Sequence, residues 1–162
     1  MGMKSVCCML VLAAALAGVR TAPIVSAQSA EAWAGTWVLN VEKSTYRLGP
    51  APASAISRLQ PLEDYWRVTQ DTVDAAQGTA VHVETMARFD GKDYPVSGLA
   101  NATWAFTRID DHTYELVTKR AGRLTATTRN VISADGSTRT SMTIGRNAQD
   151  QTLTNVAVYE RR

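Results

Sequence analysis

The sequence is poor in the two residue types most often used for metal binding and thiol chemistry. Its 162 residues include two cysteines and two histidines. Zinc clusters need several Cys or His ligands, and a Cys nucleophile needs a His partner. The composition therefore argues against a Cys/His metal centre and against thiol catalysis, and it predicts no cofactor.

An excess of charge of one sign is also missing. Lys and Arg number 17 and Asp and Glu 15, a net charge of +2. Proteins that bind nucleic acid present a strongly basic face, so nucleic acid is not an expected partner. With 45% hydrophobic and 20% charged residues, the composition is that of a globular protein, and the length favours one domain.

The start of the chain has the pattern of an export signal. Lys4 precedes an apolar run over residues 7–19, and Val25-Ser26-Ala27 has the small-x-small form of a signal peptidase site. This pattern predicts a signal peptide over residues 1–27 and a periplasmic or secreted protein. The alternative is a retained anchor, although the apolar run is short for a bilayer span.

Removal of the signal peptide changes the composition of what remains. Both cysteines, Cys7 and Cys8, are lost, and so are Lys4 and Arg20, which leaves 15 basic against 15 acidic residues. The predicted mature domain, 28–162, is thus formally neutral, without disulfides and without a transmembrane segment. At about 135 residues it can bury about two-thirds of its unfolded surface.

The mature sequence lacks helical periodicity and contains many short runs of β-branched and aromatic residues between Gly, Asp and Asn punctuation. Residues 41–54 contain Gly49, Pro50 and Pro52 and are predicted to form an irregular loop. Asp90-Gly91-Lys92 is predicted to be a hairpin turn. The expected strands cover residues 35–40, 55–59, 64–72, 79–89, 94–96, 102–109, 113–120, 123–132, 138–144 and 152–160.

Tight turns between successive strands require antiparallel neighbours. Most strands alternate apolar and polar residues, so each offers one apolar face, which a curled sheet would bury. The pattern therefore predicts an all-β, antiparallel up-and-down barrel of about 8–10 strands. A two-sheet sandwich is the alternative fold.

Alternation also indicates which side chains face the interior. Polar residues fall on the same faces as apolar ones, which favours a partly polar cavity unless bulges reverse a face; these residues are Thr85, Thr128, Asn130, Thr138 and Thr140. The predicted ligand-binding residues are Trp66, Phe89, Trp104, Phe106, Tyr114, Met142 and Tyr159. A barrel filled by its own side chains is the alternative to a cavity.

Two short motifs carry a resemblance to known families. Gly35-Thr36-Trp37 resembles the Gly-x-Trp signature of the calycin barrels, and Val158-Tyr159-Glu160 is similar to the closing segment of the fatty-acid-binding proteins. The pattern of small exported bacterial lipocalin-like proteins covers nearly the whole mature chain, at Gly35–Asn40 with Ser44, Asp90–Val96 with Gly98, 119–129, Ser133 with Asp135-Gly136, and Val158–Glu160.

The resemblance implies a barrel, with Trp37 plugging its closed end, and does not specify a ligand. Two features depart from the fatty-acid-binding proteins. Their helix pair between the first two strands has no counterpart in the short segment 41–54, and Ala157 stands where they have an Arg that meets a carboxylate.

Catalytic motifs are scarce. Asp110 and Asp111 are best explained by a turn, His82 is predicted to lie on a polar face and His112 in a turn, and no Gly-x-Ser-x-Gly elbow occurs. The first hypothesis is therefore an exported, non-catalytic barrel that binds a small, largely apolar ligand. Alternatives are a filled structural or interaction module of the cell envelope and, third, an enzyme that uses carboxylates or Tyr at the barrel mouth.

Overall fold

The computed structural model describes residues 32–47, 50–146 and 150–162. The predicted signal peptide lies outside the described residues. Within them the chain forms no helix, and so no helix that could span a membrane. Its ten strands are β1 Gly35–Tyr46, β2 Ser54–Pro61, β3 Trp66–Val73, β4 Ala80–Ala87, β5 Asp90–Pro95, β6 Ala102–Arg108, β7 Thr113–Arg120, β8 Arg123–Ile132, β9 Thr138–Arg146 and β10 Thr152–Arg161.

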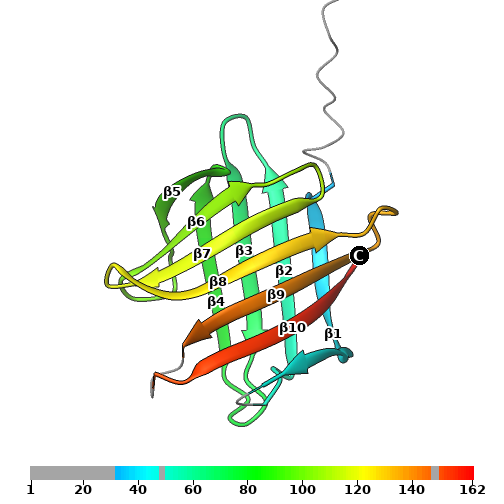
Figure 1. Cartoon of the computed structure of the whole chain (residues 1–162), viewed down its shortest axis with the longest axis vertical. Coiled ribbons are helices and arrows are strands. Elements are labelled where there is room, and N and C mark those ends of the chain that lie inside the picture. The colour runs from blue at the N-terminus through cyan, green and yellow to red at the C-terminus, as the bar shows by residue number, and fades with distance from the viewer. Residues whose placement is uncertain (1–31, 48–49, 147–149) are drawn as a thin grey trace, which may run out of the picture.

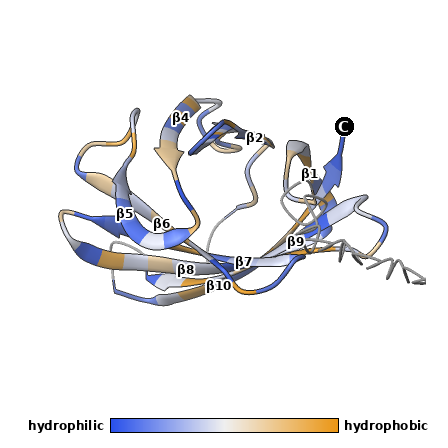
Figure 2. Cartoon of the chain, turned by 90° about the horizontal axis from the view of Figure 1, so that it is seen from above, coloured by the Kyte–Doolittle hydropathy of each residue, from blue (hydrophilic) through white to orange (hydrophobic). Residues whose placement is uncertain are grey.

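All ten strands belong to one antiparallel sheet with the order β4-β3-β2-β1-β10-β9-β8-β7-β6-β5. Strands adjacent in the chain are adjacent in the sheet, with the exception of β4 and β5. The first and last strands, β1 and β10, also pair with each other. In Figure 1, β6–β10 cross in front of β2–β4. Figure 2 shows the two groups from above, with β7–β10 on one side and β2 and β4 on the other.

The remaining opening lies between β4 and β5. It is bridged where Glu84 of β4 pairs with Ser97, which follows β5, through hydrogen bonds of 3.1 and 2.8 Å. The hydroxyl of Thr85 also donates to the carbonyl of Pro95 at 2.8 Å. The sheet is thereby a nearly closed up-and-down barrel, as the sequence predicted, and not a sandwich.

β1 is longer than the sequence predicted. The prediction of an irregular loop from residue 41 is wrong as far as Tyr46, because the strand continues after a bulge between Asn40 and Thr45. The Asn40 side chain accepts a hydrogen bond from the backbone of Lys43 at 3.0 Å. The Ser44 hydroxyl donates to the Asn40 carbonyl at 2.6 Å and accepts from the backbone of Val158 at 2.9 Å, which fastens the bulge to β10.

The hairpin predicted at Asp90-Gly91-Lys92 is also absent. These residues begin β5 and form an irregularity in its pairing with β6, between Asp90 and Asp93. Gly91 has a φ of 77°, and the Asp90 carboxylate accepts hydrogen bonds from the backbone of Lys92 at 3.1 Å and from the Tyr94 hydroxyl at 3.0 Å. The Asp-Gly pair therefore produces a bulge rather than a turn.

Aromatic side chains fill one end of the barrel. Trp37 is fully buried, its indole N–H donates to the Trp33 carbonyl at 3.0 Å, and Arg161 covers its ring. Trp33 lies 4.7 Å from Phe89 and 6.3 Å from Trp66, measured between ring centroids. Trp37 thus occupies the closed end that the resemblance implies, together with a cluster formed by Trp33, Trp66 and Phe89.

Candidate functional site

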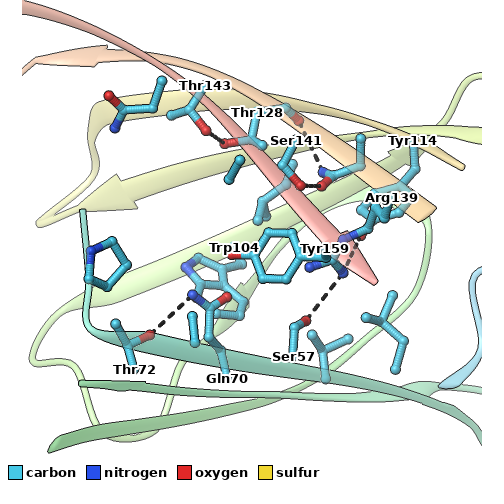
Figure 3. Close-up of a pocket in the computed structure, with 18 of the residues that line it drawn as sticks. Ser57, Gln70, Thr72, Trp104, Tyr114, Thr128, Arg139, Ser141, Thr143 and Tyr159 are labelled. Carbon is cyan, nitrogen blue, oxygen red and sulfur yellow. Dashed lines mark hydrogen bonds between the residues drawn. The ribbon is translucent and has the colours of Figure 1, made fainter. Parts of the chain in front are cut away.

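A cavity of about 250 Å³ lies inside the barrel. Figure 3 shows its lining, which comes from both groups of strands. The lining residues are Tyr46, Pro52, Ala55, Ser57, Leu59, Val68, Gln70, Thr72, Trp104, Phe106, Tyr114, Leu116, Thr128, Asn130, Arg139, Ser141, Thr143, Asn155, Ala157 and Tyr159.

Aromatic and aliphatic side chains form one part of this lining. Trp104 and Phe106 project from β6, with their ring centroids 6.1 Å apart, and Leu116 projects from β7. Leu59 and Val68 contribute from β2 and β3. This surface is suited to an apolar molecule.

A second part of the lining is polar and comes mainly from β8 and β9. The Ser141 hydroxyl donates to the Asn130 side-chain oxygen at 2.6 Å, and the hydroxyls of Thr128 and Thr143 lie 2.9 Å apart. Both pairs join residues that the strand register places opposite each other. Buried polar groups are normally paired, and these side chains satisfy one another.

Arg139 of β9 is the cationic residue of the cavity. It is 4% exposed, and its Nη1 donates to the hydroxyls of Ser57 and Tyr114, each at 3.3 Å. Its Cζ lies 4.3 Å from the ring centroid of Tyr159 and 5.5 Å from that of Trp37. Its Nε is buried without a hydrogen-bond acceptor.

Two tyrosines of the cavity, Tyr46 and Tyr114, have raised pKa values. Burial raises the pKa of the Tyr114 phenol, although the nearby Arg139 guanidinium opposes the shift. Burial, and secondarily the Tyr159 phenol, raises the pKa of Tyr46 to about 12. Both hydroxyls therefore remain neutral and able to donate a hydrogen bond at ordinary pH.

The structure brings four of the seven sequence-predicted site residues together in the cavity lining: Trp104, Phe106, Tyr114 and Tyr159. Trp66 and Phe89 lie outside the lining, in the aromatic cluster of the closed end, where Phe89 is 5.2 Å from Phe106 and 5.3 Å from Tyr114. Phe89 therefore supports the cavity wall from behind, whereas Trp66 contacts Trp33 and Phe89. That these residues bind a ligand remains a prediction.

The placement of Met142 inside the barrel is wrong. Met142 is 41% exposed, because the register sets Arg139 opposite Tyr159 and therefore turns the odd-numbered residues of β9 inward. Thr138 and Thr140, also predicted to face inward, share the outer face with Met142. On β4 and β8, the predicted inward placement of Thr85, Thr128 and Asn130 is confirmed.

Sequence reasoning missed Arg139 and Ser141 for the same reason. On β9 the outward positions include Met142 and Ile144, whereas the inward positions carry Arg139, Ser141 and Thr143. A rule that assigns the more apolar face of a strand to the barrel interior therefore selects the wrong face of β9. The signal that could have found Arg139 is its place opposite Tyr159, which requires knowledge of the pairing of β9 with β10.

The histidines and the paired aspartates lie away from the cavity. His82 is exposed on the outer surface and pairs with Asp71, whose pKa is lowered by the hydrogen bonds from His82 and Arg58. Asp110 and Asp111 are exposed in the turn before β7. In the part of the chain that the structure describes, no three His, Cys, Asp or Glu residues are grouped as a metal site.

Comparison with known proteins adds little to these observations. No family model and no curated protein matches the chain. Among solved structures, the chain is similar to the crystal structure of zebrafish ileal bile acid-binding protein complexed with cholic acid, with a TM-score of 0.47 and 12% sequence identity, over 81% of this chain and 99% of that chain.

This similarity is too weak to carry an argument. The strand order, the register and the opening between β4 and β5 define the class by themselves: a ten-stranded, calycin-like up-and-down barrel with an internal cavity. The Gly-x-Trp sequence at Gly35–Trp37 begins β1, and Trp37 is buried at the closed end.

Proposed function

We propose that the protein is an exported carrier or receptor that binds a small, largely apolar molecule inside its barrel and performs no chemistry on it. It would belong with the small exported bacterial lipocalin-like proteins that its motifs resemble, and it would act in the periplasm or outside the cell after removal of residues 1–27.

The internal cavity carries this proposal. A cavity of about 150 Å³ lined by apolar side chains is known to admit benzene, and the cavity here has a volume of about 250 Å³. Its walls combine aromatic surface from Trp104 and Phe106 with a few polar groups, the usual composition of a ligand site. None of the lining residues among those described is Asp, Glu or His, which leaves an acid–base mechanism without its usual groups.

Tryptophan fluorescence tests the proposal, since Trp104 lines the cavity. The protein is titrated with apolar probes and a lipid panel, and a saturable change in emission is expected. Replacement of Trp104 by Phe removes the reporter and should abolish most of the change. The absence of any saturable change across the panel would contradict a ligand cavity.

A variant that fills the cavity provides a second arm. Ala157 is buried in the lining, so Ala157→Leu should occupy free volume and weaken binding at least tenfold. Val158 points to the outer face of β10, and Val158→Leu is the matched control that should bind normally. Equal binding by both variants would place the ligand elsewhere.

Native mass spectrometry of the protein isolated from its own cells tests both the ligand and the export. A retained ligand is expected as added mass, and the loss of residues 1–27 is expected in the mass of the chain. An intact N-terminus would contradict cleavage. If no ligand is found in this experiment or in the titrations, and cross-linking in the envelope yields a protein partner, the filled interaction module would replace the proposal.

A further inference from the structure

We infer that the ligand of this cavity carries a carboxylate, which pairs with the guanidinium of Arg139 while its apolar body lies against Trp104 and Phe106. This inference rests on the proposed function, because it specifies the chemical class of the molecule that the cavity binds.

The first observation is a buried charge without a counter-ion. Arg139 is 4% exposed, and arginine remains protonated in proteins. No carboxylate among the described residues forms an ion pair with it, and none lines the cavity. Buried charges are ordinarily paired, since leaving water is costly for an isolated ion.

The second observation concerns what the guanidinium contacts instead. Its hydrogen bonds go to the neutral hydroxyls of Ser57 and Tyr114, both at the long distance of 3.3 Å, and its Nε has no acceptor. The faces of Tyr159 and Trp37 compensate part of the charge. These contacts hold the group in place and leave much of its donor capacity unused.

The third observation is the surrounding set of donors. The hydroxyls of Ser57 and Tyr114 each accept a hydrogen bond from Arg139, so their own protons are free to turn toward a further acceptor. A carboxylate beside Arg139 would thus meet a cation and two hydroxyl donors. Arginine is suited to this partner because its planar N–H groups match the two carboxylate oxygens.

The other wall of the cavity determines the rest of the ligand. Leu59 and Val68, on β2 and β3, and the rings of Trp104 and Phe106, on β6, can cover a short alkyl chain or an aromatic ring. The cavity of about 250 Å³ limits the body to a small one. The ligand class is therefore a small amphiphilic carboxylic acid.

Binding of four matched compounds tests the inference: octanoate, octanamide, octanol and octylamine, titrated by calorimetry into the wild-type protein. We expect octanoate to bind at least tenfold more tightly than octanamide or octanol, and octylamine to bind most weakly. Equal binding of the acid, amide and alcohol, or a preference for the amine, would overturn the inference and leave the proposed function standing. Failure of all four to bind would overturn the inference, and the broader panel of probes would then decide the proposed function.

Arg139→Met is the corresponding variant, since methionine keeps an extended apolar side chain without the charge. It should retain octanamide binding and lose the preference for octanoate. Arg129→Met, on the outer face of β8, is the control and should keep the preference. If Arg139→Met does not fold, the wild-type series decides alone. If the variant folds and still prefers octanoate, the inference is wrong.

Discussion

The guanidinium of Arg161 lies over the indole ring of Trp37, with 4.4 Å from its Cζ to the ring centroid. The same group donates hydrogen bonds of 2.6 Å to the carbonyls of Ala32, Ala34 and Gly136. One side chain near the end of β10 therefore joins the segment before β1, the turn before β9 and the plug of the barrel.

Replacement of Arg161 by Ala should remove all of these contacts. Three buried or half-buried carbonyls would lose their donor, and the Trp37 ring would lose its cation, so we expect a loss of about 3 kcal/mol in the free energy of unfolding. Urea denaturation measures the change. Arg162→Ala, at an exposed position one residue further, should change the stability by less than about 0.5 kcal/mol.

Ser44→Ala tests the bulge in β1. The backbone N–H of Val158 would lose its acceptor and the Asn40 carbonyl its donor, which should cost about 1–2 kcal/mol. Thr45→Ala, at the exposed neighbouring residue, is the control and should have a small effect. If the two variants unfold at the same urea concentration, the bulge does not depend on the Ser44 hydroxyl.

Gly98→Ala tests the connection across the opening between β4 and β5. Gly98 has a φ of 86°, and a Cβ there would overlap the carbonyl oxygen of His82. The backbone must move, and we expect a loss of more than about 3 kcal/mol. Gly122 has a similar φ of 75° but open space around it, so Gly122→Ala should cost only about 1 kcal/mol. Thermal denaturation of the two variants isolates the effect of the overlap.

Truncation of Phe106 and Met142 compares an inner with an outer residue that the sequence assigned to the same site. Phe106 is 1% exposed, and Phe106→Ala should destabilise the fold by about 3–5 kcal/mol. Met142 is 41% exposed, and Met142→Ala should stay within about 0.5 kcal/mol and leave ligand binding unchanged. A large effect at Met142 on stability or binding would contradict the assignment of β9 faces.

The buried phenols predict a loss of stability at alkaline pH. Burial holds the pKa of Tyr46 at about 12 in the folded state and also raises the pKa of Tyr114, so the folded protein retains protons that the unfolded chain releases. Their contribution is fully present below about pH 10, the ordinary pKa of tyrosine, and is lost as the pH rises toward the folded values. Urea midpoints measured from about pH 8 to 11 should fall only above about pH 10. Tyr46→Phe should lessen the decline, and an unchanged decline would assign it to other groups.

The sequence determined much of the strand order because its turns are local. The bounds predicted for β7 and β8 match those observed, and most others differ by a few residues. Two errors, at 41–46 and at Asp90–Lys92, come from bulges, in which Gly and polar residues continue a strand rather than end it. Most of the side-chain hydrogen bonds in these bulges join residues two to four apart, as they would in a turn, and only the bond between Ser44 and Val158 joins distant strands. Local patterns therefore do not distinguish a bulge from a turn.

The cavity was predictable only in part. Alternation shows which residues share a face, and apolarity then indicates which face is inside. The second step fails on β9, where Met142 and Ile144 face outward and the inward face carries Arg139 and Ser141. Polar residues that face the interior reduce the free energy gained by burying apolar surface. Such departures from the rule that apolar residues face inward are expected where a binding site is formed.

The opening between β4 and β5 has a consequence for how the protein behaves in a crowded solution. An open ten-stranded sheet would offer two rows of unpaired backbone groups to other chains, the starting point of edge-to-edge aggregation. Here the two edges belong to neighbouring strands and turn toward each other, linked at Glu84 and Ser97. The curvature that encloses the cavity also brings the two edges of the sheet together, so the fold itself shields part of each edge strand from pairing with another chain.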